Sequence, residues 1–351
     1  MTTIYDVIRV GTDANLASIN PAGKVIEFAD GIYSAGIHVL PSFAGTAERP
    51  TVLRAENRWQ ARIMNAAGGH GIYVARGADH VVIDGFDVAS PLWDGVKTEG
   101  RFTTIHNCWI HKNQGQGILS NGWRTIVDGC LVEGNGGDPQ WTHGIYPTGE
   151  GCIIRGCIIR HNGGQGISAI SQGSQQRGLI VCDNLIYGNG GSQIYVTGNV
   201  AGRQAPITID HNTIIGGRDP ALSVGVYIVE PTVQVSVTDN IITSPIGQMV
   251  EKRVTPNDVL KRPARVLEAG NVVAVDERDL PFRNAYRGDY RLAAGSPYTD
   301  SGWPLARQPV SDLDWARDPS NPKSAKWPYA NAHQIGRYMA PLSLFPEVPS
   351  A

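Results

Sequence analysis

The chain has 351 residues, of which 18% are charged and 7% aromatic, and its 42 glycines indicate frequent tight turns. A formal net charge of -2 excludes the basic surface that nucleic-acid binders need, so nucleic acid is not an expected partner. No apolar run approaches the roughly 20 residues of a membrane-spanning helix, so no membrane association is expected.

The first 50 residues contain no repeat and are predicted to form an N-terminal cap and a first irregular coil. They begin with MTTIYDVIRVGTDANLAS, which lacks the basic and apolar blocks of a secretory signal. An extracellular protein is still expected, with its signal removed or, alternatively, as part of a phage particle. Five cysteines, an odd number in a long chain, predict buried free thiols rather than a disulfide framework.

Residues 51–250 repeat at a period typical of a β-solenoid. Six segments share one frame: IHNCWIHKNQGQGI from Ile105, VDGCLVEGN from Val127, IRGCIIRHNGGQGI from Ile154, VCDNLIYGNGGSQI from Val181, IDHNTIIGG from Ile209 and VTDNII from Val237. Their anchor positions recur every 22 to 28 residues, at Cys108, Cys130, Cys157, Asn184, Asn212 and Asn240. The apolar residues alternate over short runs, which is the periodicity of strands.

Asparagine recurs at two positions of the repeat. An Asn at the anchor position predicts side-chain hydrogen bonds along the stack and a left-handed corner at that residue. The second row, Asn113, Asn135, Asn162 and Asn189, opens a Gly-rich loop. A short strand follows each loop, for example HGIYV from His70 and HGIYP from His143. The sequence therefore predicts an all-β fold, a right-handed parallel β-helix of about nine or ten coils with caps at both ends. Residues 251–351 are predicted to be coil remnants and a capping tail.

These repeats resemble the pectate-lyase-like superfamily of right-handed parallel β-helices over most of the chain. The segment AGKVIEFADGIY, with GTAERPTVLRAEN from Gly45, is similar to the first coils of the alginate and chondroitin lyases. GDYRLAAGSPYTDSG from Gly288 and HQIGRY from His333 are similar to the ends of many secreted β-helix proteins. The resemblance implies that a ligand lies across the sheet after the Gly-rich loops. It does not select an activity, because the same solenoid carries lyases, hydrolases, epimerases and phage tailspikes.

Alternation along the strands of this sheet predicts which side chains face outward. The inward set is Val96, Ile118, Ile145, Ile167, Ile194 and Val226, and the outward row is Tyr73, Lys97, Leu119, Tyr146, Ser168, Tyr195 and Tyr227. Functional residue types concentrate from His70 to Tyr146, a span of about 14 Å that would hold two or three sugar rings. The predicted substrate-binding residues are His70, Tyr73, Asp94, Glu99, Asn121, Trp141 and Tyr195.

A polysaccharide lyase acting on a uronate-containing polymer is the first functional hypothesis. β-Elimination needs a base, an acid and a group that stabilises negative charge. Lys97 and His143 are alternative bases, Tyr146 is the predicted acid, and Arg101 at the corner of the Lys97 coil is the predicted charge stabiliser. The alternative for Lys97 is a surface ion pair with Glu99. The alginate and chondroitin lyases combine a Lys with an Arg on a neighbouring coil, where this chain has Leu119. The repetition of HGIY also fits a packing role for the motif.

Three carboxylates, those of Asp94, Glu99 and Asp138, support a second hypothesis, an inverting glycoside hydrolase. The same three are candidate Ca²⁺ ligands, and no other cofactor is predicted. A third hypothesis is a phage or cell-surface receptor-binding spike without catalysis, expected to be a trimer, whereas a lyase is expected to be a monomer. A solvated surface is predicted for His106, His111, Lys112, Arg155, Arg160 and His161.

Overall fold

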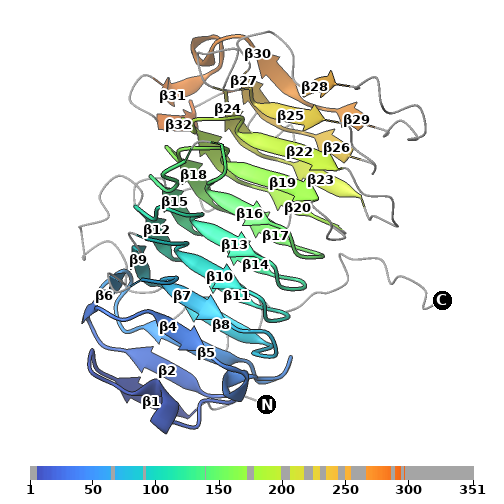
Figure 1. Ribbon diagram of the computed structural model, residues 1–351. Coiled ribbons are helices and arrows are strands. Elements are labelled where there is room, and N and C mark those ends of the chain that lie inside the picture. The colour runs from blue at the N-terminus through green and yellow to red at the C-terminus, as the bar shows by residue number, and fades with distance from the viewer. Residues whose placement is uncertain are drawn as a thin grey trace, which may run out of the picture.

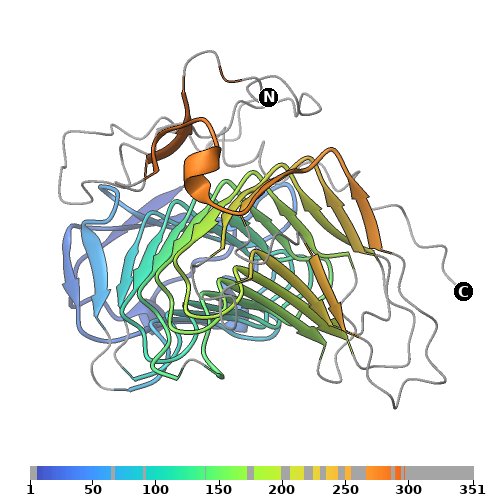
Figure 2. The same cartoon turned by 90° about the horizontal axis from the view of Figure 1, so that it is seen from above.

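The described strands wrap around one core as three parallel sheets. The computed structural model describes residues 6–64, 68–89, 92–138, 140–171, 178–198, 206–216, 224–229, 235–243, 250–253, 266–285, 289–293 and 296. Successive coils stack along the long axis of the molecule (Figure 1), and the view from above shows the three sheets as the sides of a prism (Figure 2). The predicted parallel β-helix is therefore confirmed.

Sheets A, B and C each take one strand from every coil. Sheet A consists of β1 (Val7–Val10), β2 (Val25–Phe28), β5 (Thr51–Ala55), β8 (Val81–Asp84), β11 (Thr104–His106), β14 (Ile126–Asp128), β17 (Ile153–Arg155), β20 (Ile180–Cys182), β23 (Ile207–Asp210), β26 (Val235–Thr238) and β29 (Val266–Ala269). Sheet B consists of β3 (Gly31–Tyr33), β6 (Ala61–Met64), β9 (Asp87–Ala89), β12 (Trp109–His111), β15 (Leu131–Glu133), β18 (Ile158–Arg160), β21 (Leu185–Tyr187), β24 (Thr213–Ile215), β27 (Ile241–Thr243) and β30 (Val272–Ala274). Sheet C consists of β4 (Ile37–Val39), β7 (Ile72–Val74), β10 (Val96–Thr98), β13 (Ile118–Ser120), β16 (Ile145–Pro147), β19 (Ile167–Ser171), β22 (Ile194–Gly198), β25 (Val226–Val229) and β28 (Val250–Arg253).

The nine strands of sheet C correspond to nine complete coils within the described part of the chain. The first of these coils is β2, β3 and β4, and β1 pairs with its outer edge. Strands β29 and β30 begin a further coil. In the part of the chain that the structure describes, three short 3₁₀ helices lie in connections: η1 (Leu16–Ser18), η2 (Pro41–Phe43) and η3 (Glu277–Asp279). Over the described residues, no helix is long and apolar enough to cross a membrane. The boundaries at residues 50 and 250 stay a prediction.

The core is a column of inward-facing, mainly aliphatic side chains contributed by the three sheets. Ile83, Ile105, Ile118 and Ile145 are completely inaccessible to solvent. Each coil buries only one side of its strands, so neighbouring coils must stack to close the core. All five cysteines are free thiols, and four of them are buried, which agrees with the expected absence of a disulfide framework.

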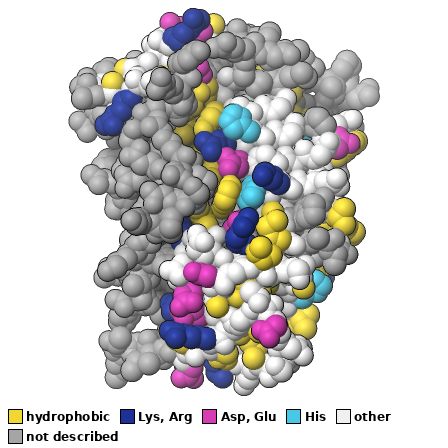
Figure 3. Space-filling view, turned by 90° about the vertical axis from the view of Figure 1, so that its left-hand side faces the viewer, with side chains coloured by type: hydrophobic (Ala, Val, Ile, Leu, Met, Phe, Trp, Pro, Cys, Tyr) yellow, Lys and Arg dark blue, Asp and Glu magenta, His cyan; other side chains and the backbone are white. Residues whose placement is uncertain are grey.

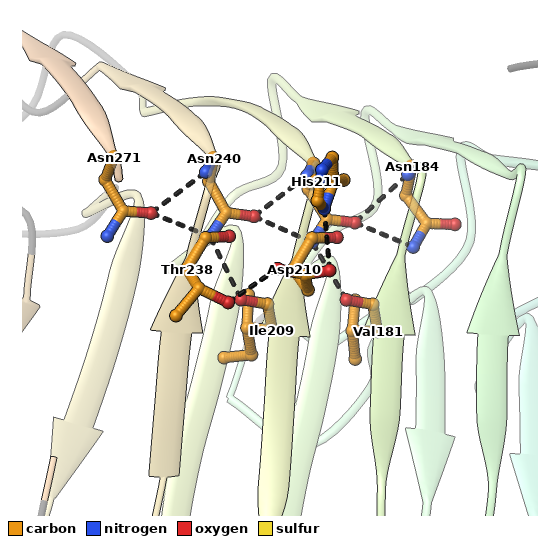
Figure 4. Close-up of polar contacts among 9 residues, drawn as sticks. Val181, Asn184, Ile209, Asp210, His211, Thr238, Asn240 and Asn271 are labelled. Atoms are coloured by element: carbon orange, nitrogen blue, oxygen red, sulfur yellow. Dashed lines mark hydrogen bonds and ion pairs between the residues drawn. The ribbon is translucent and has the colours of Figure 1, made fainter. Parts of the chain in front are cut away.

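Two asparagine ladders run along the corners of the solenoid. In the first, Asn184, Asn212 and Asn240 each donate from Nδ2 to the Oδ1 of the next residue at 2.9 Å, and the last acceptor is Asn271 (Figure 4). The second ladder, Asn113 through Asn135 and Asn162 to Asn189, ends on Gln193 Oε1 at 2.7 Å. Each ladder residue also donates to a backbone carbonyl of the preceding coil, so the amide hydrogens on Nδ2 are satisfied inside the protein.

The left-handed residue of each corner is the one before the ladder position. Asp183, His211 and Asp239, which precede the three Asn of the first ladder, have φ angles of 58°, 54° and 53°. The prediction that the ladder Asn itself is left-handed was wrong by one residue. The ladder Asn follows this left-handed residue, and its side-chain amide faces the neighbouring coils.

The Gly of the HGIY-type motifs has a packing role. A Cβ on Gly117 would lie 2.6 Å from the carbonyl oxygen of Gly144 and 2.8 Å from Asn135 Nδ2. The following residue, Ile118 or Ile145, lies in the core. The repeated Gly-Ile pair is therefore structural, and only the residues on either side of it are free to differ in function.

The outer face of sheet B is partly covered by the antiparallel hairpin of β31 (Phe282–Asn284) and β32 (Asp289–Leu292). Tyr290 packs against Tyr187 with ring centroids 5.0 Å apart. Charged side chains and histidines gather in a band along this side of the molecule (Figure 3). The described part of the C-terminal region thus contributes a cover for one face of the solenoid.

Two histidines expected on a solvated surface are buried instead. His106 Nδ1 lies 3.0 Å from Asp84 Oδ1, and His111 Nε2 lies 2.7 Å from Asp87 Oδ1. Burial alone would lower the pKa of His106, but its hydrogen bond to Asp84 raises the pKa overall. Arg155 and Arg160 are half-buried and form ion pairs with Asp128 and Glu133, respectively. Lys112 and His161 are exposed, as expected. The sequence did not reveal the acidic partners because they lie on neighbouring coils, more than 20 residues away.

Candidate functional site

The outward row of sheet C has the register that alternation predicts. Lys97 pairs with Tyr73 on one side and with Leu119 on the other, and Leu119 pairs with Tyr146. These four side chains are half-buried, while the inward residues Val96 and Ile118 are inaccessible. Ser168, which belongs to the same predicted row, is completely buried. The solvent-facing part of the row that can contact a ligand therefore includes the four residues from Tyr73 to Tyr146.

A charged cluster occupies the row at β7 and β10. Lys97 Nζ lies 3.2 Å from Glu99 Oε1, and the Tyr73 hydroxyl donates to Glu99 Oε2 at 3.0 Å. Lys97 Nζ also lies 5.6 Å from the centroid of the Tyr73 ring. Burial by itself would raise the pKa of Glu99, but the bonds from Tyr73 and Lys97, aided by the charge of Arg76, lower it. Burial and the bond to Glu99 raise the pKa of Tyr73.

The cation that acts on this cluster is Arg76 rather than Arg101. Arg76 is exposed, and its charge acts on both Tyr73 and Glu99. Arg101 is exposed too, and its backbone N–H donates to Asp79 Oδ1 at 2.9 Å. Across the described residues the structure records no contact between the Arg101 side chain and Lys97. Arg76 was not predicted, because it lies beyond the end of β7 and approaches Glu99 only through the stacking of two coils.

The loop-side margin of sheet C is a chain of hydrogen bonds through successive coils. The Gln116 N–H donates to Asp94 Oδ1 at 2.7 Å, the His143 N–H to Gln116 Oε1 at 2.6 Å, and the Gln165 N–H to His143 Nδ1 at 3.2 Å. His70 Nδ1 lies 3.2 Å from Asp94 Oδ2 at the start of the chain. Asp94 and His143, predicted as functional residues, thus also satisfy backbone N–H groups of the next coil.

His143 is buried and uncharged at neutral pH. Burial lowers its pKa to about 4. Because Nδ1 accepts the N–H of Gln165, the neutral ring carries its proton on Nε2, and Nε2 is then a donor rather than a base. This geometry argues against the predicted role of His143 as general base. Its ring meets the Tyr146 ring edge-on, with centroids 5.6 Å apart.

Tyr146 is half-buried, and burial raises the pKa of its hydroxyl. A phenol with a raised pKa keeps its proton at neutral pH and can donate it. Its hydroxyl has no hydrogen-bond partner among the residues that the structure describes. Leu119 lies between Tyr146 and Lys97 and forms an apolar floor one strand wide.

Two tryptophans frame the loop-side margin. Trp93 is 55% exposed and Trp141 is 61% exposed. Trp93 packs edge-on against His70 with centroids 5.1 Å apart, and the Trp141 carbonyl accepts from Gln116 Nε2 at 2.8 Å. Trp141 was predicted as a substrate-binding residue, but Trp93 was missed, although its place in the loop before Asp94 is comparable to that of Trp141 before His143.

The other predicted binding residues lie on sheet C but outside this cluster. Asn121 is exposed at the far margin, where its Oδ1 accepts from Thr148 Oγ1 at 2.6 Å. Tyr195 packs against Tyr227 with ring centroids 5.4 Å apart. Both contacts are local to sheet C, so these residues extend the candidate face rather than join Lys97.

The three carboxylates proposed for hydrolysis or calcium binding each have hydrogen-bond or ion-pair partners of their own. Asp138 Oδ1 accepts from the Gln140 N–H in its own turn at 2.8 Å, while Asp94 and Glu99 have the partners given above. Within the described residues, the group of acidic and His side chains close enough to hold a metal ion is a different one, Asp210, His211 and Asp239. A calcium ion at Asp94, Glu99 and Asp138 stays a prediction.

Comparison with known proteins identifies the class of the fold. A family model for the right handed beta helix region matches residues 60–242, more than half of the chain, and the chain belongs to this family. It is similar to the crystal structure of pectate lyase Pel9A, at 16% identity over 78% of each chain, with a TM-score of 0.56. It is also similar to an alginate lyase from Paenibacillus sp. str. FPU-7, at 18% identity over 77% of this chain and 95% of that one, with a TM-score of 0.57. No curated protein sequence matches the chain. The predicted pectate-lyase-like fold is confirmed.

Proposed function

We propose that the protein is an extracellular polysaccharide lyase that cleaves a uronate-containing polymer on the outer face of sheet C. The observation that carries this proposal is the row Lys97, Leu119 and Tyr146 on three adjacent strands. A sugar unit above Leu119 has a cation on one side and a protonated phenol on the other. Since adjacent strands are about 4.8 Å apart, both long side chains reach the space above Leu119.

The charge of the Lys97 cluster favours an acidic substrate. Lys97 and Arg76 carry two positive charges against the single negative charge of Glu99, so a uronate carboxylate entering the cluster is attracted. Arg76 takes the charge-stabilising role that the sequence suggested for Arg101. In its neutral amine form, Lys97 turns from Glu99 towards Leu119 and abstracts the α-proton, while Arg76 holds the uronate carboxylate.

Tyr146 supplies the proton that the leaving oxygen needs. Its raised pKa and its hydroxyl, which has no partner in the described structure, suit a general acid. His143, with a proton on Nε2, supports this end of the site as a hydrogen-bond donor. Trp93 and Trp141 offer exposed aromatic faces on which sugar rings stack. They belong to the loops before β10 and β16, two coil steps or about 10 Å apart.

The carboxylates favour a lyase over an inverting hydrolase. A hydrolase needs one carboxylic acid with a raised pKa to protonate the leaving oxygen. The pKa of Glu99 is lowered, and both of its oxygens are engaged. Asp94 is engaged through both oxygens as well.

The test is incubation with a panel of uronate polysaccharides, including alginate, pectate and chondroitin, while ultraviolet absorbance of unsaturated ends and the number of new reducing ends are both followed. Absorbance that rises together with reducing ends supports elimination. Reducing ends without absorbance contradict it in favour of hydrolysis. Binding without either product favours the receptor-binding spike, and a measurement of molecular mass separates the monomer expected of a lyase from the trimer expected of a spike.

A further inference from the structure

A second cluster of chemically active side chains lies on the corner between sheets A and B, away from sheet C. Asp183, His211 and Asp239 occupy the left-handed corner position in three successive coils, each just before a residue of the first Asn ladder. Figure 4 shows Asp210, His211 and Thr238 beside that ladder. The strands that carry them, β20, β23 and β26, are neighbours in sheet A.

Three of these side chains have the geometry of metal ligands. Potential ligand atoms of Asp210, His211 and Asp239 all lie within 4.8 Å of one another. His211 Nδ1 lies 2.6 Å from Asp210 Oδ2, and Thr238 Oγ1 donates to Asp210 Oδ1 at 2.5 Å. The contact between His211 and Asp210 fixes the orientation of both side chains, and it leaves His211 Nε2 and the remaining lone pairs of the Asp210 carboxylate available to a metal ion.

The second ring nitrogen of His211, Nε2, is not engaged by the described part of the protein. His211 Nε2 is buried without a hydrogen-bond partner among the described residues, and the whole side chain is only 15% exposed. A buried polar atom without a partner is costly, so such an atom calls for an explanation. The Asp239 carboxylate likewise makes no hydrogen bond to the described residues. Gly270 leaves room for it, because a Cβ there would approach Asp239 Oδ1 to 2.0 Å.

The surroundings of the cluster are strongly negative. Asp183, at the same corner of the preceding coil, brings a third carboxylate close to His211 and Asp210. The nearby cation is Arg155, whose guanidinium lies 2.9 Å from Asp128 and is therefore shared with a fourth carboxylate. Three carboxylates thus lie around one imidazole, an arrangement that attracts a cation.

We propose that Asp210, His211 and Asp239 bind one divalent transition-metal ion, Zn²⁺ or Mn²⁺, which links two adjacent coils of the solenoid. Imidazole favours the transition metals over Ca²⁺ and Mg²⁺, and carboxylates complete a mixed nitrogen and oxygen set for either ion. The ion is structural, since the cluster lies on a corner that sheet C does not share. Its loss changes stability and leaves the proposed reaction at Lys97 and Tyr146 unaffected.

The test uses the full chain without a polyhistidine tag, stripped with a chelator and then titrated calorimetrically with Zn²⁺, Mn²⁺ and Ca²⁺. Thermal unfolding is followed in parallel. We expect one equivalent of Zn²⁺ or Mn²⁺ to bind and to raise the Tm, because a ligand that binds only the folded state stabilises it. Absence of saturable binding, or binding of Ca²⁺ alone, overturns the proposal.

Variants locate the site. His211→Asn and Asp239→Asn keep a residue that tolerates the left-handed corner and should abolish both metal binding and the metal-dependent rise in Tm. Thr238→Val, which removes the hydroxyl that orients Asp210, should weaken binding by roughly 10-fold or more. His161→Asn is the matched control, since His161 is an exposed left-handed corner residue with a φ of 53°. Unchanged binding in the two ligand variants, or equal loss in the control, places the ion elsewhere and refutes the assignment.

Discussion

The Lys97 ammonium group lies 3.2 Å from the Glu99 carboxylate, two residues further along the chain. In an extended strand, residues i and i+2 face the same side, so this pair forms on the outer face of sheet C. Both side chains are about one quarter exposed, at 22% for Lys97 and 24% for Glu99. The pair keeps Lys97 close to the candidate site and directs it towards Tyr73 rather than Leu119.

Replacing Glu99 by Gln should raise the rate of cleavage while changing the stability of the fold little. Without the carboxylate, the Lys97 amine no longer has to leave an ion pair before it turns towards Leu119, so kcat/KM should rise by roughly 2- to 5-fold, in line with the small free energy of a partly exposed pair. The free energy of unfolding should fall by less than about 1 kcal/mol, because a partly exposed ion pair contributes little. The absorbance assay measures kcat/KM at neutral pH. Glu48→Gln, at an exposed position, is the control, and an unchanged or lower kcat/KM for E99Q contradicts a base at Lys97 that must leave Glu99.

Tyr146→Phe removes the proposed acid while keeping the ring. We expect the rate of cleavage to fall by roughly 10² to 10⁴-fold, the contribution typical of general acid catalysis, with polymer binding nearly unchanged. Steady-state kinetics and a binding isotherm measure the two effects separately. Tyr290→Phe, in the hairpin on sheet B, should behave like the unsubstituted protein. If Y146F retains full activity, Tyr146 is not the acid.

His143 should make the protein sensitive to mild acid. Its pKa is about 4 in the folded protein, below the ordinary value of 6.5, so the unfolded chain binds the proton first as the pH falls. Stability is unaffected above the ordinary value and declines between about pH 6.5 and pH 4, by up to roughly 3 kcal/mol from this residue. Urea unfolding at about pH 7 and about pH 4.5 measures the change. His143→Gln should reduce the decline, whereas His161→Gln, at an exposed position, should not. Equal declines in both variants would exclude His143 as the cause.

Asn135→Ala should be strongly destabilising. The Asn135 amide donates to Ile110 O and Asn162 Oδ1, both at 3.0 Å, and its Oδ1 accepts from Asn113 Nδ2 at 2.6 Å. The substitution leaves several buried polar groups without partners, which should lower the free energy of unfolding by about 2 to 4 kcal/mol. Asn57→Ala, at an exposed position, should change it by no more than about 0.5 kcal/mol. Denaturant titrations of both variants test the comparison, and a similar small effect of each would show that the ladder is dispensable.

Much of the fold was predictable because residues of the same type recur at fixed positions of each coil. Ile118 and Leu119 alternate between the core and the outer face as strand periodicity requires, and the Asn rows mark the corners. The ends of the ladders were not predictable. Gln193 and Asn271 complete them, yet neither stands at an evident repeat position. Gln193 lies inside the motif SQIYV, and Asn271 follows a stretch of sequence in which the repeat pattern fades.

The candidate site was predictable only in its location. Lys97, Tyr146 and Trp141 lie on the expected face, but Arg76 rather than Arg101 acts on the charged cluster, and His143 is tied to the Gln165 backbone. The carboxylates assigned to hydrolysis or calcium have partners of their own. The group that does resemble a metal site, Asp210, His211 and Asp239, lies on another corner of the solenoid.

The sequence by itself determined the coil length, the inward and outward faces of each strand and the positions of the corners. These follow from local rules of strand alternation and turn chemistry that act within one coil. The tertiary structure alone decided which charges and hydrogen bonds meet, including Arg76 with Glu99 and His106 with Asp84. Such pairs join residues of different coils, and their contact depends on the stacking register and on how long side chains fill the space between strands. No single coil of sequence contains that information.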